Sequence, residues 1–140
     1  MSAPPSLYVD VAGRAWEERR PGVFWKILWE EGERKAVLMR YTAGATIARH
    51  RHLGDEQIWV LEGSVTDDSG TCTAGNYARR PPGCVHTVRS DGGALVLAIM
   101  PPAEAALIAL RGLRTDIADA VLERARYYYT GPLDPRSSRT

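Results

Sequence analysis

The sequence predicts an all-β domain with a C-terminal α-helical extension, and three observations support this fold class. The chain has 140 residues, which is the size of one domain with one core. From Gly22 to about Ile99, short apolar or alternating runs are separated by turn residues, a pattern typical of a β-sandwich or β-barrel. After Pro102 the sequence becomes rich in Ala, Leu and Arg and takes on a helical period.

These changes in pattern divide the chain into four parts. We expect an N-terminal arm over residues 1–20, a β-barrel over 21–102, a helical extension over 103–130 and a tail over 131–140. Both ends are rich in Pro, Ser and charge, which favours frayed termini. The expected strands, in chain order, are Val23–Trp29, Lys35–Tyr41, Thr46–His52, Gln57–Leu61, Asn76–Arg79, Val85–Arg89 and Ala94–Ile99.

The helical extension has one apolar face. The residues on this face follow helical spacing, and Thr115 or Asp116 is placed to cap the helix start. We expect this face to pack across the outside of the barrel or against a second subunit, because an amphipathic helix must bury its apolar side. The face consists of Ile117, Val121, Leu122, Ala125 and Tyr128.

Composition excludes several classes of function. With 18 basic and 17 acidic residues the formal net charge is +1, which argues against a nucleic-acid partner. No apolar run is long enough to span a membrane and the N-terminus lacks a signal pattern, so we expect no membrane partner and a cytoplasmic location. The two cysteines, Cys72 and Cys84, are expected to be reduced thiols, with Cys84 a small buried residue.

The candidate chemistry lies in the three histidines and one glutamate. His50 and His52 alternate along an expected strand and therefore share a face. The short turn that follows lets the chain double back, so that Glu56 can meet the two rings. His86 follows the stiff Pro81–Gly83 turn, which can aim it into the barrel. Imidazoles and a carboxylate suit a divalent transition metal, so His50, His52, Glu56 and His86 are the predicted metal ligands.

Other residues are candidates for the wall of a substrate pocket. Ile58 and Val60 share a face with Glu56 and would make that wall apolar, with Gly63 ending the strand. Trp25 and Trp59 are further candidates, although core or interface packing is the commoner role of strand aromatics. Arg40 is a candidate for binding an anionic substrate. In the Arg79-Arg80 pair at most one side chain can enter the barrel, because neighbours on a strand face opposite ways.

Two motifs carry a family resemblance. The sequence contains Gly44-x5-His50-x-His52-x3-Glu56-x6-Gly63, followed by Gly75-x5-Pro81-x-Gly83-x2-His86. Both resemble the two motifs of the cupin superfamily, with Ser90 where the second motif often has Asn. Over roughly residues 16–100 the chain is most similar to the ChrR-like cupins. This group includes the cupin domain of zinc-binding anti-sigma factors and the acetylacetone and dihydroxyacetophenone dioxygenases.

The resemblance implies a double-stranded β-helix, or jelly roll, with one metal near a mouth of the barrel. It also implies a non-haem Fe(II) dioxygenase that cleaves a carbon–carbon bond in a small enolisable ketone or diketone. Iron is the favoured metal, with Zn, Mn and Ni as alternatives, and O2 is a co-substrate. Glu56 is a candidate base as well as a ligand. We also expect a homodimer, because pairing covers exposed strand edges.

Two other functions stay open at this point. One is a non-catalytic sensor or ligand-binding cupin that binds zinc, as the resemblance to the anti-sigma factors implies. The other is an isomerase, cyclase or lyase that uses the metal only as a Lewis acid. The metal that the protein binds would discriminate between these and the oxygenase.

Overall fold

A computed structural model describes residues 2–32, 34–52 and 54–100, and all of its regular elements there are strands. The predicted helical extension and tail lie outside the described residues. Among the described residues no helix could cross a membrane. The nine strands are β1 (Glu17–Arg20), β2 (Val23–Glu31), β3 (Arg34–Tyr41), β4 (Ala45–Arg51), β5 (Glu56–Asp67), β6 (Gly70–Thr73), β7 (Tyr77–Arg80), β8 (Val85–Ser90) and β9 (Ala94–Met100).

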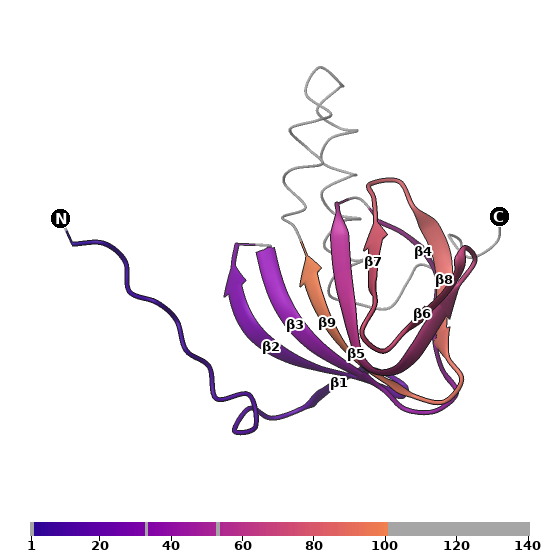
Figure 1. Ribbon diagram of the computed structural model, residues 1–140, viewed down its shortest axis with the longest axis horizontal. Coiled ribbons are helices and arrows are strands. Elements are labelled where there is room, and N and C mark those ends of the chain that lie inside the picture. The colour runs from indigo at the N-terminus through magenta and orange to yellow at the C-terminus, as the bar shows by residue number, and fades with distance from the viewer. Residues whose placement is uncertain (1, 33, 53, 101–140) are drawn as a thin grey trace, which may run out of the picture.

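The strands wrap into a nearly closed antiparallel barrel (Figure 1). Strand order is β1-β2-β3-β9-β5-β8-β4, with β6 and β7 both paired to β5. The long β5 connects the two sides of the barrel, because its first half pairs with β9 and β7 and its second half with β6 and β8. This is the jelly-roll arrangement that the sequence predicts, so the fold class is confirmed.

The structure also corrects the predicted boundaries. The predicted arm ends in a strand, since β1 pairs with β2 and belongs to the sheet. Strand β6 was not expected. Gly63 does not end β5, which continues to Asp67. A short polar strand such as β6 has too few apolar residues to give an alternating pattern, so its pairing with β5 decides its structure.

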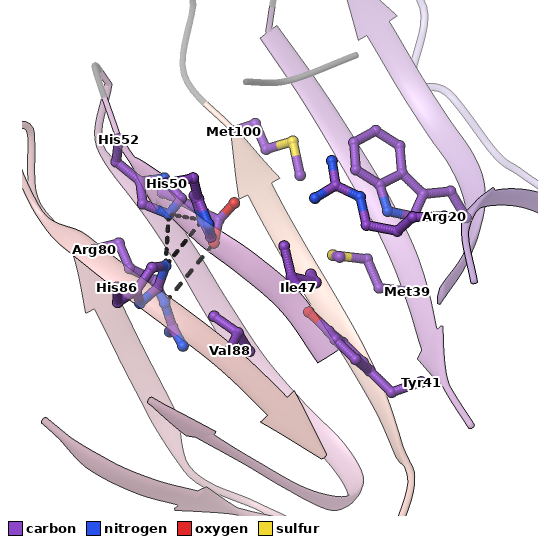
Figure 2. A pocket seen from close by; sticks show the side chains of 12 residues that line it. Arg20, Met39, Tyr41, Ile47, His50, His52, Arg80, His86, Val88 and Met100 are labelled. Atoms are coloured by element: carbon purple, nitrogen blue, oxygen red, sulfur yellow. Dashed lines mark hydrogen bonds and ion pairs between the residues drawn. The ribbon is translucent and has the colours of Figure 1, made fainter. Parts of the chain in front are cut away.

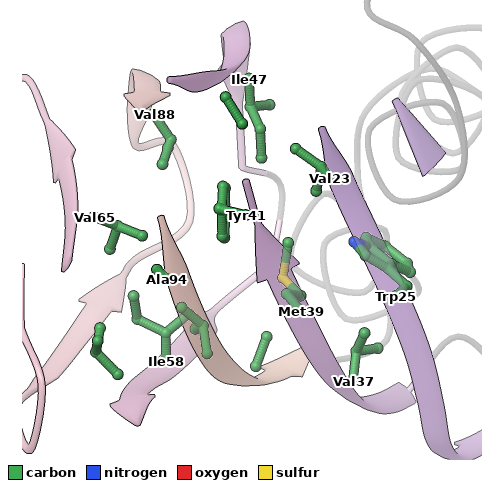
Figure 3. Close-up of a cluster of buried hydrophobic side chains, with 14 of the residues drawn as sticks. Val23, Trp25, Val37, Met39, Tyr41, Ile47, Ile58, Val65, Val88 and Ala94 are labelled. Atoms are coloured by element: carbon green, nitrogen blue, oxygen red, sulfur yellow. The ribbon is translucent and has the colours of Figure 1, made fainter. Parts of the chain in front are cut away.

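The barrel interior is a single apolar core (Figure 3). Its side chains come from alternate positions, as the two-residue period of a strand requires. On β3, for example, Val37, Met39 and Tyr41 are buried while Arg40 is exposed. The core residues are Val23, Trp25, Val37, Met39, Tyr41, Ala45, Ile47, Ile58, Val60, Val65, Val88, Ala94, Val96, Ala98 and Met100.

Gly63 marks the point where β5 passes from one side of the barrel to the other. Its φ is +72°, a conformation that favours glycine, and it follows a register shift between Val60 and Glu62. A Cβ atom at this position would lie 2.0 Å from the carbonyl oxygen of Gly93. Two backbone segments therefore approach each other here more closely than any side chain allows.

We predict that Gly63→Ala destabilises the protein by about 3 kcal/mol, because it combines backbone strain with a clash against backbone that cannot move away. Gly75→Ala is the matched control. Gly75 has a similar φ of +84°, but a Cβ there would meet nothing within 4 Å. Chemical denaturation of both variants measures the difference. Equal losses of unfolding free energy would mean that the close approach at Gly63 is unimportant.

Candidate metal centre

Pairing between β4 and β8 brings two of the three histidines together. His50 and His86 are register partners on these antiparallel strands, and both side chains are buried. His52 lies just beyond the end of β4. Its backbone N–H donates to the Cys84 carbonyl at 2.8 Å, and its carbonyl accepts from the Gly83 N–H at 2.7 Å. The turn before His86 thus also fixes His52.

A bulge in β4 turns the histidines inward. Ala45 and Ile47 point into the core, so strict alternation would place His50 and His52 on the outer face. The register shifts between Ile47 and His50, which changes the alternation by one residue. One strand therefore contributes Ile47 to the core and both histidines to the barrel interior.

The three imidazoles meet at their Nε2 atoms (Figure 2). The Nε2–Nε2 distances are 2.9 Å from His50 to His52, 2.9 Å from His52 to His86 and 3.1 Å from His86 to His50. These nitrogens form a nearly equilateral triangle. Among the described residues, this is the group of His, Cys, Asp and Glu side chains whose ligand atoms converge as a metal site requires.

Hydrogen bonds at the opposite ring nitrogens determine two of the tautomers. Nδ1 of His50 lies 2.9 Å from the Ala48 carbonyl oxygen, and Nδ1 of His86 lies 2.8 Å from Oδ2 of Asp67. Both oxygens only accept, so each Nδ1 carries the proton. In the neutral ring Nε2 then has a free lone pair, and both lone pairs point at the centre of the triangle.

Burial keeps the three rings neutral. It lowers the pKa of His50 to about 4, and it lowers the pKa of His52 to about 2 with added repulsion from the other two histidines. Burial also lowers the pKa of His86, against the opposing effect of Asp67. The Nε2 atoms of neutral His50 and His86 cannot hydrogen-bond to each other, so a cation between them is the natural partner for their lone pairs.

The triangle fits a transition metal. At metal–nitrogen distances of about 2.1 Å, nitrogens at right angles around an ion lie about 3.0 Å apart, and tetrahedral ones about 3.4 Å apart. The observed distances of 2.9 to 3.1 Å match one face of an octahedron. Such a face leaves the opposite side of an ion open to other ligands, and three neutral imidazoles suit iron, nickel, copper or zinc.

Glu56 lies beside the triangle and is paired with Arg80. The two are register partners on β5 and β7, and Oε1 of Glu56 lies 4.0 Å from Nε of Arg80. Burial raises the pKa of Glu56 to about 7, although the Arg80 charge opposes this rise. The group of converging ligand atoms does not include Glu56, so its role as a fourth ligand stays a prediction.

A chain of charged groups extends from Glu56 to His86. Arg80 also lies 3.6 Å from Oδ2 of Asp67, the same oxygen that accepts the proton of His86 Nδ1. Burial alone would raise the pKa of Asp67. The hydrogen bonds from His86 and from the Ser69 backbone, together with the Arg80 charge, hold it below its ordinary value. Asp67 is therefore an anion that orients His86 and increases its basicity.

The triangle lines a cavity of about 50 Å³ inside the barrel. The volume corresponds to about four water molecules. Apolar side chains cover much of the cavity wall away from the histidines (Figure 2). The lining residues are Arg20, Trp25, Met39, Tyr41, Ile47, His50, His52, Glu56, Arg80, His86, Val88 and Met100.

The structure divides the predicted wall residues into three groups. Trp25 lines the cavity, whereas Ile58 and Val60 lie in the core and do not reach it. Arg40 and Trp59 are not among the residues that line this cavity. Alternation turns both outward: Arg40 stacks on Trp16 at 5.0 Å on the outside of β3, and Trp59 is 47% exposed.

The sequence did not indicate that Asp67, Tyr41 and Arg20 belong to the site. For Arg80 it indicated only that either Arg79 or Arg80 enters the barrel. Strand β7 buries Arg80 and leaves Arg79 outside, where it pairs with Asp55 at 2.8 Å. Strand alternation requires that only one of Arg79 and Arg80 faces inward, but it does not say which one. Asp67 lies on the part of β5 beyond Gly63. A strand that was expected to end at Gly63 could not place Asp67 near the histidines.

The fold and the site together define a class of protein: a small β-barrel with a histidine-lined metal centre in its interior, as in cupins. The sequence profile described as the ChrR cupin-like domain matches residues 5–101. The chain therefore belongs to the ChrR cupin-like family. Comparison with curated protein sequences gave no match.

Solved structures support this assignment. A chain from the Rhodobacter sphaeroides complex of SigE with the anti-sigma ChrR is 26% identical with a TM-score of 0.60, over 65% of this chain but only 51% of that one. An acetylacetone dioxygenase from Acinetobacter johnsonii is 15% identical with a TM-score of 0.60, over 71% of this chain and 75% of that one. The polyketide cyclase RemF from Streptomyces resistomycificus is 18% identical with a TM-score of 0.61, over 69% and 80%. The last two show the common fold.

We predict that Asp67→Asn weakens metal binding by about 10- to 100-fold, because an amide is a poorer partner for His86 Nδ1–H than a carboxylate is. His86→Ala removes the ligand itself and should abolish most binding. Asp68→Asn is the control, since Asp68 contacts Arg49 and the Thr87 backbone instead of the histidines. Competition with a chelator measures the affinities. An unchanged affinity in Asp67→Asn would contradict the proposed role of this carboxylate.

We also predict a pH-dependent effect of Glu56→Gln on the metal-free protein. The pKa of Glu56 is raised from 4.5 to about 7, so its contribution to stability is present below pH 4.5 and is lost as pH rises through about 7. Glutamine stays neutral, and the variant should therefore gain about 3 kcal/mol over wild type at pH 8. The gain should vanish at pH 4.

Chemical denaturation at both pH values measures this difference. The histidines affect the pH dependence of stability in the opposite direction. Their pKa values are lowered, so their contribution to the unfolding free energy is lost as pH falls from 6.5. That contribution is common to wild type and variant, so their difference isolates Glu56. A difference that is independent of pH would mean that the Glu56 carboxyl is not shifted.

Proposed function

We propose that this protein is a mononuclear metal-dependent enzyme, specifically a non-haem Fe(II) dioxygenase that cleaves a carbon–carbon bond in a small enolisable ketone or diketone. The observation that carries the proposal is the triangle of Nε2 atoms. Its 2.9 to 3.1 Å edges suit one face of an octahedral ion. The opposite face is then available for a bidentate substrate and O2.

Iron(II) bound by these histidines would supply Lewis acidity towards the substrate oxygens and one-electron chemistry towards O2. O2 is the oxidant in this reaction, and both of its atoms enter the products. The protein contributes a fixed set of neutral imidazoles, oriented by Ala48 and Asp67. It also contributes a small cavity with an apolar wall that limits the access of water.

Glu56 is the residue best suited to move a proton. It lines the cavity, and a carboxyl with a pKa of about 7 can accept a proton at neutral pH and return it. Removing the proton between two carbonyl groups converts a diketone to its enolate. Arg80, 4.0 Å from Glu56, can stabilise the carboxylate before the transfer. This role requires Glu56 to remain outside the ligand set.

A specific observation also favours a second function. The chain is 26% identical to a chain of the SigE–ChrR complex, although it spans about half of that chain. A zinc-binding sensor or ligand-binding cupin without catalysis is therefore the alternative proposal. A third candidate, an isomerase, cyclase or lyase, would use the same centre as a Lewis acid alone. The RemF likeness concerns the fold and adds no chemistry of its own.

Metal analysis of protein purified without oxygen, from cells supplied with several metals, tests the proposal. We expect about one Fe per chain, retained in Gly75→Ala and lost in His50→Ala. Oxygen uptake with 2,4-pentanedione as the first probe should then depend on that iron. Stoichiometric zinc that resists chelation, with no oxygen uptake in iron-reconstituted protein, would contradict the oxygenase and favour the sensor.

A further inference from the structure

Arg80 is a buried cation whose two ion pairs are long. Its side chain is 5% exposed and lines the cavity of the three histidines. The nearest carboxylate oxygens lie at 3.6 Å on Asp67 and 4.0 Å on Glu56. Both distances exceed about 3.2 Å, which is the upper limit for a good N–H···O hydrogen bond. Among the described residues, these long ion pairs are the polar contacts of the guanidinium.

Neither carboxylate makes a hydrogen bond to the guanidinium. Asp67 already accepts from His86 at 2.8 Å and from the Ser69 backbone at 2.8 Å, one bond at each of its oxygens. Glu56 is the register partner of Arg80, and its Oε1 lies 4.0 Å from Nε of Arg80. The five N–H donors of a guanidinium form a rigid fork that matches a carboxylate, and here the fork borders a cavity.

A bound metal ion would make the charge of the cavity favour an anion. The charged residues in its lining are Arg20, Glu56 and Arg80, and the Asp67 carboxylate lies 3.6 Å from Arg80. Imidazole binds a metal ion in its neutral form, so three histidine ligands would not offset the charge of a bound divalent ion. A buried positive charge is costly unless an anion compensates it. An anionic substrate would provide that compensation at the moment it binds.

We propose that the substrate carries a carboxylate in addition to the two oxygens that face the histidines, and that Arg80 binds this carboxylate. Within the proposed class of diketones, this favours a small dioxo acid over a neutral diketone. This inference rests on the proposed metal centre and deepens it by naming the group that Arg80 selects.

A second space beside Arg80 must be distinguished from the metal cavity. A groove of about 530 Å³ is lined by Arg79, Arg80 and Cys84. An anion bound in that groove would contact both arginines. An anion in the metal cavity would meet Arg80 and not Arg79, because Arg79 is exposed and paired with Asp55.

The test compares two ligands that differ in one group. The compound 2,4-dioxopentanoate is 2,4-pentanedione with one methyl replaced by a carboxylate. Calorimetric titration into zinc-loaded protein measures binding without turnover. We expect wild type to bind the acid about 10- to 100-fold more tightly, since hydrogen bonds to a charged group contribute this much. Arg80→Gln should lose this preference, and Arg79→Gln should retain it.

Other outcomes separate failure of this inference from failure of the metal centre. Equal binding of both ligands by metal-loaded wild type would overturn the inference and leave the metal centre intact. A preference for the acid that survives in Arg80→Gln would also overturn the inference. Loss of the preference in Arg79→Gln as well would overturn it by placing the anion in the groove. Absence of zinc binding in wild type would overturn both. If Arg80→Gln does not fold, Arg80→Lys keeps the charge without the fork and should still reduce the preference.

Discussion

Three imidazole Nε2 atoms facing one point, at 2.9 to 3.1 Å from each other, are the constraint on which the rest of this barrel depends. Two of them are held in place by acceptors behind the rings, the Ala48 carbonyl and the Asp67 carboxylate. Burial removes the alternative of protonation, because it lowers the pKa of each ring. The fold therefore maintains a repulsive arrangement that a cation relieves, which is how metal binding and folding become coupled.

Two backbone irregularities let a narrow barrel hold both an apolar core and this polar centre. The bulge after Ile47 reverses the alternation of β4, so that Ile47 and His50 both point inward. The positive φ of Gly63 lets β5 continue past the core to Asp67, which then reaches His86. Without the bulge, a regular β4 would place the histidines on the outer face. Without the turn at Gly63, β5 would not bring the Asp67 carboxylate to His86.

The sequence predicted most of the fold and the three histidines that converge, but little of their surroundings. Strand alternation and glycine turns are local, so the barrel strands and the shared orientation of His50 and His52 could be anticipated. The partners of the centre depend on cross-strand register, which no local pattern specifies. Arg80 opposite Glu56, and Asp67 behind His86, are of this kind. Strand alternation places Arg40 and Trp59 on the outside of the barrel, away from the cavity.

The position of Glu56 links the charge of the centre to its chemistry. As a ligand, Glu56 would cancel one positive charge and leave fewer positions for substrate. Outside the ligand set, with a pKa of about 7 beside Arg80, it can carry a proton while the ion keeps its full charge. An anion that enters the cavity would balance part of that charge. A neutral three-histidine set, a titratable glutamate and a buried arginine are thus consistent with each other if the substrate itself is the anion.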